Sequence, residues 1–370
     1  MTNKCFMIKD GKLYTATIPP RPMFGKSREP RVVTGLEYKG IEAVLLENQA
    51  LRLVILPGKG GDILEFRDKQ TDVDILWHSD HNWFPPENRY IPSEAPTTWM
   101  DHYPGGWQMN LPVAGFGWEI AGNAYGIHGE SALIPWETTI KRNNEDVVEV
   151  GLSTDLNRYP FHVERDFTLT SGESAIEISE TIENRGEVDL EYIWQQHIAI
   201  GPPLLSPDAR LEIPATAGQT AAYNGNFPNA RLRGDTEFEW PNAPGKDEDT
   251  IDLRKIPPRS SESHDLLYLT EMDAGRCKLT NPNLDLSFEF SFDLEQFDSL
   301  WYWQPFGGYE DSPYFGRNYN IGIEPTNAYP ASNIPEAQRA NGSMKSLSAG
   351  EEIHVVYNAQ LGPDEQNRRG

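Results

Sequence analysis

Alternation between apolar and polar residues is the pattern that most constrains how this chain can fold. In residues 175–184 the isoleucines fall on one side of an extended strand, and acidic or hydroxyl side chains fall on the other. The same period of two recurs in residues 146–156, 162–170 and 284–294, although Arg165 interrupts the apolar side of one of them. This period is typical of antiparallel strands with one face against a core and the other toward water.

Helical periodicity is scarce, and turn motifs such as residues 170–174 and 184–187 separate the alternating segments. Many short strands without interleaved helices favour an all-β sandwich or a barrel-like fold. Residues 1–35 contain few strand-like patterns, so we expect an N-terminal extension packed on the body. Residues 36–370 are then expected to form one domain.

The net charge of the chain limits the classes of molecule that it can bind. There are 56 acidic side chains against 32 Lys and Arg, which gives a formal net charge of −24. Such a chain repels phosphate backbones and anionic lipids, so neither nucleic acid nor a membrane is an expected partner. Cys5 and Cys277 make neither a disulfide framework nor a CxxC zinc motif. Because no signal-peptide or membrane-spanning pattern appears, we expect a cytoplasmic monomer or homodimer.

Residues 102–137 mix aromatic side chains with Gln108, Asn110 and His128. The glycines of this segment lack the spacing of phosphate-binding loops. Pyranose rings offer C–H faces to aromatic rings and hydroxyls to polar groups, so the composition suits a sugar, although the tryptophans also suit a core. His128 stands near glycines that give it little to pack against, and it could bind a sugar, bind a metal or shape a turn.

Two further residues are candidates for acid–base chemistry. His197 lies in an alternating segment, residues 190–200, that ends at a Gly-Pro-Pro break, and Glu324 directly precedes a proline that ends the short strand 319–325. A rigid strand that faces a cleft holds a proton donor still. A buried sheet histidine and a solvated glutamate are the structural alternatives. In one pocket, an imidazole and a carboxylate could act as general acid and general base.

Weaker features lie elsewhere. Trp303 and Gln304 belong to an aromatic strand that leads into paired glycines, and His264 and Asp265 come just before another strand. The histidines in residues 78–81 have a spacing that could hold a metal on a helix, but the prolines that follow indicate a loop. We therefore expect no metal site.

Four stretches, residues 51–77, 105–136, 192–203 and 321–351, resemble the aldose 1-epimerase (galactose mutarotase-like) superfamily in the order of their motifs. The first stretch has a glycine pair before a strand and an Asp-x-x-Thr turn, and the second has Gly-Gly and His-Gly followed by Pro-Trp. The third has a second histidine before Gly-Pro-Pro, and the fourth has Ile-Glu-Pro. The resemblance implies one large antiparallel β-sandwich, the supersandwich, with a sugar cleft across one sheet.

The resemblance also implies roles for the candidate residues. Glu324 is similar in position to the family's general base, His197 to its general acid, and His128 to the histidine that binds the sugar near the reacting carbon. Exchange of sugar anomers needs a base for the O1 proton and an acid for the ring oxygen, and a carboxylate with an imidazolium can supply both. No cofactor is required.

Further substrate-binding positions follow from the same resemblance. Asp265 is similar to a sugar-binding aspartate, and Gln304 to a sugar-binding glutamine whose place Trp303 could equally fill. Arg67 is the nearest upstream arginine in a strand and is the candidate for the family's binding arginine. Members that act on phosphorylated hexoses carry arginine before the Gly-Gly pair, where this chain has Tyr103 and proline. The sugar is therefore not determined.

Three functions remain. A mutarotase, an isomerase of carbohydrate metabolism, is favoured because both His197 and Glu324 are present. A sugar-binding protein without turnover would need neither residue in particular. A glycoside hydrolase or polysaccharide lyase is the third, and a hydrolase would need a second carboxylate about 5–9.5 Å from the first. Glu130 is the candidate for that second carboxylate.

Overall fold

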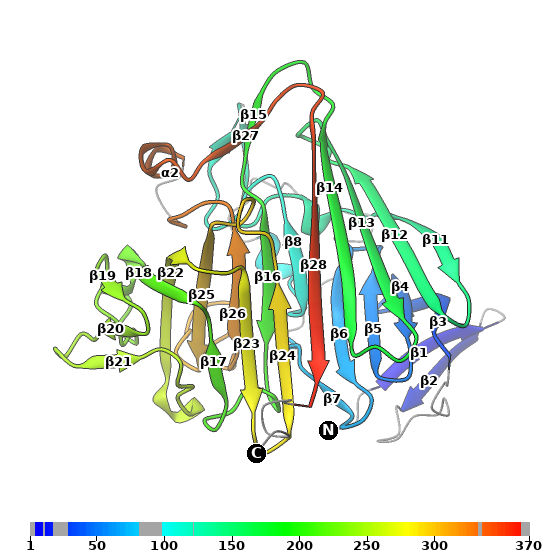
Figure 1. Cartoon of the computed structure of the whole chain (residues 1–370), viewed down its shortest axis with the longest axis horizontal. Coiled ribbons are helices and arrows are strands. Elements are labelled where there is room, and N and C mark those ends of the chain that lie inside the picture. Colours follow the sequence, from blue (N-terminus) through cyan, green and yellow to red (C-terminus); the bar gives the residue numbers. More distant parts are fainter. Residues whose placement is uncertain are drawn as a thin grey trace.

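The alternating segments form antiparallel strands in the computed structural model, which describes residues 4–9, 12–17, 29–80, 98–120, 122–331 and 335–363 (Figure 1). The four segments that predict strands coincide, within two or three residues at each end, with β12 (Val147–Asp155), β13 (Phe161–Thr170), β14 (Ala175–Asn184) and β24 (Leu286–Ser291). Two large sheets dominate the fold, and their neighbouring strands pair antiparallel. The expected all-β sandwich is confirmed.

The first large sheet has eight strands. In spatial order they are β11 (Glu137–Asn143), β12, β13, β14, β28 (Glu352–Gly362), β24, β23 (Arg276–Asn281) and β17 (Arg210–Glu212). Figure 1 shows this sheet in front of the second one.

The second large sheet has twelve strands. In order they are β19 (Glu237–Glu239), β18 (Ala215–Thr220), β22 (Ser263–Met272), β25 (Ser299–Phe306), β26 (Ile321–Thr326), β16 (Gln195–Ile200), β8 (Trp107–Asn110), β6 (Asp62–Asp68), β5 (Leu51–Leu56), β4 (Ile41–Glu47) and β3 (Arg31–Tyr38), with β7 (Val73–Asp74) beside β6.

Short elements lie outside the two large sheets. Two are the α-helices α1 (Thr98–Asp101) and α2 (Glu336–Asn341), and Ser131–Leu133, Ala222–Gly225 and Arg259–Ser261 are 3₁₀ helices. The others are the two-stranded pairs β1 (Lys4–Lys9) with β2 (Lys12–Thr17), β9 (Glu119–Ile120) with β10 (Asn123–Ala124), β15 (Leu190–Tyr192) with β27 (Lys345–Leu347), and β20 (Asn242–Pro244) with β21 (Thr250–Asp252).

The core lies between the two large sheets. Phe66 of β6 meets Phe288 of β24 edge to face at 6.0 Å between ring centroids, and Trp107 of β8 meets Phe290 of β24 at 5.0 Å. All four side chains are fully buried. Edge-to-face packing at these distances is favourable beyond the burial of area alone, so aromatic contacts hold the sheets face to face.

The arginine that interrupts the apolar face of β13 has a partner in the next strand. Arg165 lies opposite Glu180 of β14 in the strand register, and their side chains form a fully buried ion pair at 2.7 Å. Glu180 also accepts hydrogen bonds from Trp194, Gln196 and Tyr357. A buried charge needs both a partner of opposite charge and hydrogen bonds. Arg165 and Glu180 therefore offset the desolvation cost of each other, although each interrupts the apolar face of its strand.

The expected boundary after residue 35 falls inside β3, which forms one edge of the second sheet. A shift in strand register between Val33 and Leu36, around Gly35 with a φ of +71°, interrupts the alternation there. Such a bulge hides the strand from a period-two search. Of the expected extension, residues 1–3, 10–11 and 18–28 lie outside the described residues.

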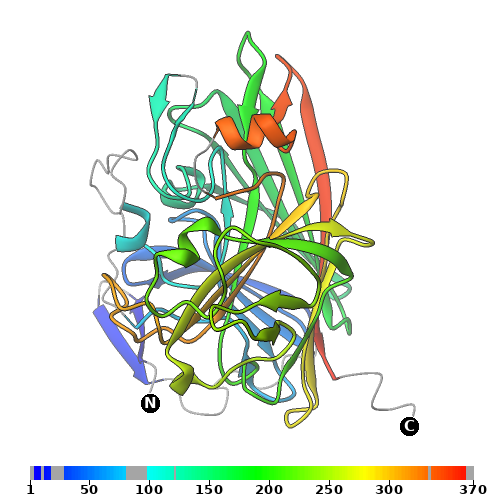
Figure 2. The ribbon, with the colours of Figure 1, turned by 90° about the vertical axis from the view of Figure 1, so that its left-hand side faces the viewer.

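Loops and α1 cover the face of the second sheet that points away from the first sheet. In the side view, α1 (cyan) lies on the opposite side of the molecule from β28 (red) (Figure 2). A separate apolar cluster forms here, and it includes Trp77, Trp99, Tyr103 and Tyr314. The candidate site lies beside this cluster.

Candidate active site

Adjacent strands of the second sheet present the candidate residues on one face. Gln196 of β16 reaches the buried Glu180 of the first sheet at 2.7 Å. Successive side chains of a strand point to opposite faces, so His197 points outward. There it lines a cavity of about 320 Å³ together with Glu324 of β26 and Trp303 of β25. This volume lies within the range of about 300–1,000 Å³ that is usual for small-molecule sites.

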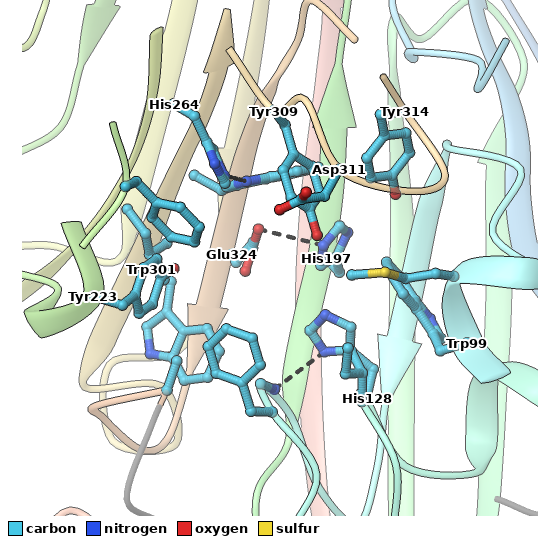
Figure 3. Close-up of a pocket in the computed structure, with 18 residues that line it drawn as sticks. Trp99, His128, His197, Tyr223, His264, Trp301, Tyr309, Asp311, Tyr314 and Glu324 are labelled. Carbon is cyan, nitrogen blue, oxygen red and sulfur yellow. Dashed lines mark hydrogen bonds and ion pairs between the residues drawn. The ribbon is translucent and has the colours of Figure 1, made fainter. Parts of the chain in front are cut away.

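Glu324 and His197 contact each other in the middle of the cavity (Figure 3). Glu324 Oε1 lies 3.4 Å from His197 Nε2, and Gln195 donates its amide N–H to Glu324 Oε2 at 3.1 Å. Gly322 makes room for this arrangement, because a Cβ there would lie 2.2 Å from Glu324 Oε1. Burial raises the pKa of Glu324 well above its ordinary value, since a desolvated carboxyl favours its neutral form.

His197 is held by aromatic neighbours. The Tyr103 hydroxyl lies 3.4 Å from His197 Nδ1, and the Trp99 ring contacts the imidazole with 5.4 Å between centroids. Burial lowers the pKa of His197 to about 3, because desolvation disfavours the imidazolium. Tyr103, which lies two residues before the pair Gly105 and Gly106, thus contacts the histidine that the sequence analysis assigns as the acid.

His128 has a defined tautomer. It adopts a left-handed backbone conformation with a φ of +60°, and the backbone N–H of Gly115 donates to its Nδ1 at 3.2 Å. A nitrogen that accepts this bond carries no proton, so the neutral ring carries its proton on Nε2. Burial and the nearby His197 lower the pKa of His128 well below its ordinary value. His128 is therefore a neutral donor in the wall of the cavity, 5.0 Å from His197 between ring centroids.

A buried polar chain fixes Trp99 behind the two histidines. Trp99 donates its indole N–H to Gln108 at 2.9 Å, and Gln108 donates to Asp62 at 2.7 Å. Asp62 forms a fully buried ion pair with Lys59 at 2.5 Å. Trp99 in turn stacks on Tyr103 with 4.1 Å between centroids. Gln108, predicted to bind the sugar, instead supports a residue that lines the cavity.

Three predicted binding residues lie away from the cavity. Asp265 is fully buried and accepts from the Arg231 side chain at 2.9 Å, and Gln304 accepts from the same guanidinium. Both belong to the opposite face of their strands from His264 and Trp303, because side chains alternate. Arg67 pairs with Glu65 at 3.0 Å. None of the three lines the cavity, so the structure does not bring them together with Glu324 and His197.

Glu130 is also outside the cavity. Its carboxylate is buried and accepts the backbone N–H of Arg158 at 3.1 Å. Burial raises the pKa of Glu130. The contact ties residues 128–131 to the loop that follows β12, so Glu130 supports the structure and does not face Glu324.

His264 is a cavity residue that the sequence analysis singled out without a role. Trp303 donates its indole N–H to His264 Nε2 at 2.9 Å. Because indole is only a donor, the proton of the neutral imidazole lies on Nδ1. Burial lowers the pKa of His264 to about 4, which keeps the ring neutral. Residues of short helices and loops that sequence periodicity did not reveal also line the cavity, and they include Trp99, Tyr223, Phe227, Tyr309, Asp311 and Tyr314.

No group of three or more His, Cys, Asp or Glu residues in the described ranges has the proximity needed to hold a metal ion. No helix in that part of the chain has the length and apolar character required to cross a membrane.

Solved structures share the fold. A protein from Klebsiella pneumoniae, described as a putative aldose 1-epimerase, superposes with a TM-score of 0.68 at 15% identity, over 91% of this chain and 84% of that one. Galactose mutarotase-like proteins from Clostridium acetobutylicum (TM-score 0.62, 15% identity, 91% of this chain, 100% of that one) and Lactobacillus casei (0.58, 15%, 86%, 100%) are also similar. No curated protein matches the sequence.

The chain has the galactose mutarotase-like β-sandwich fold, as the sequence motifs predict. A family model described as "Domain of unknown function (DUF4432)" matches residues 38–361, which is most of the chain. The chain belongs to the DUF4432 family.

Proposed function

We propose that this protein interconverts the α and β anomers of an aldose sugar, with Glu324 and His197 as the acid–base pair. The observation that carries the proposal is the 3.4 Å contact between Glu324 Oε1 and His197 Nε2 inside a buried, aromatic cavity. A carboxyl and an imidazole within hydrogen-bond reach of the same bound molecule are the two groups that ring opening needs.

The proton count of the pair supports this chemistry. A carboxylate with an imidazolium and a carboxyl with an imidazole contain the same number of protons, and they differ only in where one proton lies. Burial favours the uncharged arrangement of Glu324 and His197. A sugar between them separates the two groups and supplies hydroxyls that hydrogen-bond the charged arrangement.

Ring opening requires that one proton leaves the sugar and that another is added to it. Glu324 removes the proton from the O1 hydroxyl while His197 donates a proton to the ring oxygen, and the bond between C1 and the ring oxygen breaks. The open aldehyde rotates about C1–C2. Ring closure on the other face of C1 returns both protons with the roles of Glu324 and His197 reversed.

The remaining lining residues suit binding. His128 offers its Nε2–H to an oxygen of the sugar near C1, because its Nδ1 is occupied by the Gly115 N–H. Trp301 and Trp303 lie beside Glu324 on the sheet and offer apolar surface to the C–H face of the ring. We propose that Trp99 and Gln108 keep the histidines in place.

The experiment is an anomer-exchange panel. Magnetisation exchange between anomers is measured by NMR for glucose, galactose, xylose and their phosphorylated and acidic counterparts, with and without the protein. Catalysed exchange of at least one free sugar is expected. Saturable binding without exchange for every sugar would show a binding protein, and release of new reducing ends from a polymer would show a hydrolase or lyase; either result would overturn the proposal.

A further inference from the structure

Five aromatic rings form a continuous wall on one side of the cavity, which we call the ring wall. Its members are Phe116, Tyr223, Phe227, His264 and Tyr309. Consecutive ring centroids are 5.5, 5.1, 5.0 and 4.6 Å apart in that order. Such spacings are those of packed aromatic pairs, so the rings make one connected surface.

The ring wall lies across the cavity from the residues that hold His197. In Figure 3, Tyr223 and His264 stand on one side of Glu324, and His128 and Trp99 stand on the other. A sugar that reacts at Glu324 and His197 therefore has the ring wall beside its far end. A run of five rings is longer than a single six-membered sugar ring.

Two properties of the ring wall are not explained by a monosaccharide at the acid–base pair. Phe116, at one end, is 45% exposed, which is unusual for a large aromatic side chain beside a cavity. His264, near the other end, is 5% exposed, and its Nδ1 has no hydrogen-bond partner among the described residues. A buried donor without a partner is costly unless a ligand or water supplies an acceptor.

The charges around the cavity restrict the ligand further. Among the described lining residues, the only carboxyl side chains are those of Glu324 and Asp311, and none is Lys or Arg. Asp311 is exposed and lines the same cavity as Glu324 and His197. A negatively charged substituent would face these carboxylates without a cation from the described lining.

We propose that the ring wall is a second sugar subsite, which holds the neighbouring unit of an uncharged reducing disaccharide or longer saccharide while the reducing unit lies between Glu324 and His197. The inference rests on the proposed anomer exchange and deepens it by naming the substrate class. Sugar rings have apolar C–H faces that stack on the aromatic surface, and His264 donates its Nδ1–H to an oxygen of the second unit.

The test compares sugars that differ by one unit. Rates of anomer exchange are measured for glucose and galactose against cellobiose, maltose, lactose and melibiose. The expected result is a kcat/KM at least about tenfold higher for one disaccharide than for its reducing monosaccharide, as stacking on two or three rings would give. Monosaccharides exchanged as well as every disaccharide would overturn the subsite and leave the proposed function intact.

Variants localise the effect. Phe116→Ala and Tyr309→Ala each remove one ring from the ring wall, and both should lower the ratio of disaccharide to monosaccharide kcat/KM by about three- to tenfold. Phe315→Ala is the matched control, because Phe315 follows Tyr309 in the same loop, is 65% exposed and is outside the described lining. An unchanged ratio in folded Phe116→Ala and Tyr309→Ala proteins would overturn the proposal.

A binding measurement separates the subsite from turnover. Methyl β-cellobioside and methyl β-maltoside have no free anomeric hydroxyl, so calorimetry with them reports binding alone. If no sugar is exchanged, the proposed function fails, and weaker binding of these glycosides to Phe116→Ala than to Phe315→Ala still supports the subsite. Equal binding by the two variants, or no binding to the wild-type protein, would overturn it.

Discussion

Replacement of Gln195 by methionine should shift the pH dependence of the proposed reaction. Gln195 donates to Glu324 Oε2 at 3.1 Å, and a donor to a carboxylate favours its charged form and lowers its pKa. A hydrogen bond to a charged group contributes about 1.5–3 kcal/mol, and 1.36 kcal/mol corresponds to one pKa unit. Gln195→Met therefore raises the pKa of Glu324 by about one to two units.

The sign follows from the proton that the pair shares. Exchange requires one proton on Glu324 and His197 together, so the alkaline limit is the loss of that proton and the acid limit is the gain of a second one. Because burial lowers the pKa of His197 to about 3, the wild-type rate should be flat down to the pH at which the protein unfolds. Gln195→Met should move the alkaline limit up by about one to two pH units.

The assay is kcat/KM for anomer exchange from pH 5 to pH 10, with the uncatalysed rate subtracted at each pH. Gln196→Met is the matched control, since Gln196 is the next residue in β16 but hydrogen-bonds Glu180 between the sheets at 2.7 Å. The control should lose stability and keep the wild-type alkaline limit. An alkaline limit that is the same in folded Gln195→Met and in wild type would refute the reasoning.

Three further predictions concern buried groups. Arg165→Met should lower the free energy of unfolding by about 3–5 kcal/mol, because it leaves the buried Glu180 carboxylate without its cation. The double variant Arg165→Met/Glu180→Leu should recover most of that loss. Denaturant titration measures both variants, and a double variant no more stable than Arg165→Met would contradict the prediction. His264→Asn should make the free energy of unfolding less dependent on pH, because the pKa of His264 is about 4 in the folded protein and ordinarily 6.5. The contribution of His264 to stability is therefore complete above pH 6.5 and declines by roughly 3 kcal/mol as the pH falls to 4. Thermal melts measure this, and the same change of stability with pH in variant and wild type would count against the prediction. Glu130→Gln should leave anomer exchange within about twofold of wild type, because Glu130 does not line the cavity; a loss of exchange by a hundredfold in the NMR assay would restore Glu130 as a chemical group.

The strands could be predicted because alternation is a local property. β14 is an example, since its isoleucines alternate with polar residues through Asn184 and the strand ends there. The pairing of Arg165 with Glu180 could not be predicted from either strand alone, because the register that places them opposite each other depends on the turn between β13 and β14. β3 was missed at its start because a bulge interrupts the period at Gly35.

The site was predictable where a residue type and a motif agreed, as with His128, His197 and Glu324, which the structure places around one cavity. The choice between His264 and Asp265 was not predictable, because alternation says only that neighbours face opposite sides. The pairing of β22 with β25, which places Leu266 opposite Trp303, decides it. Gln195 could have been found, since it lies two residues before His197 and so shares its face.

Trp99 and the ring wall have a different origin. They come from α1, from the start of β22, from the loops after β8 and β25, and from the segment around Tyr223, which are far apart in sequence. No period or spacing relates such segments, and only the folded sheet brings them together. Loops held by a rigid scaffold commonly carry binding residues for this reason.

The most direct measurement is NMR anomer exchange by the Glu324→Gln protein, on the sugar that wild type exchanges best. An amide cannot accept the O1 proton, so the rate should fall by about 10²- to 10⁴-fold while the affinity for the sugar changes little. The exchange rate of His197→Asn should fall by a similar factor. The rate of the double variant should be only slightly lower than that of either single variant, because the two groups act in the same proton-transfer step. Wild-type exchange by a folded Glu324→Gln protein would contradict the account.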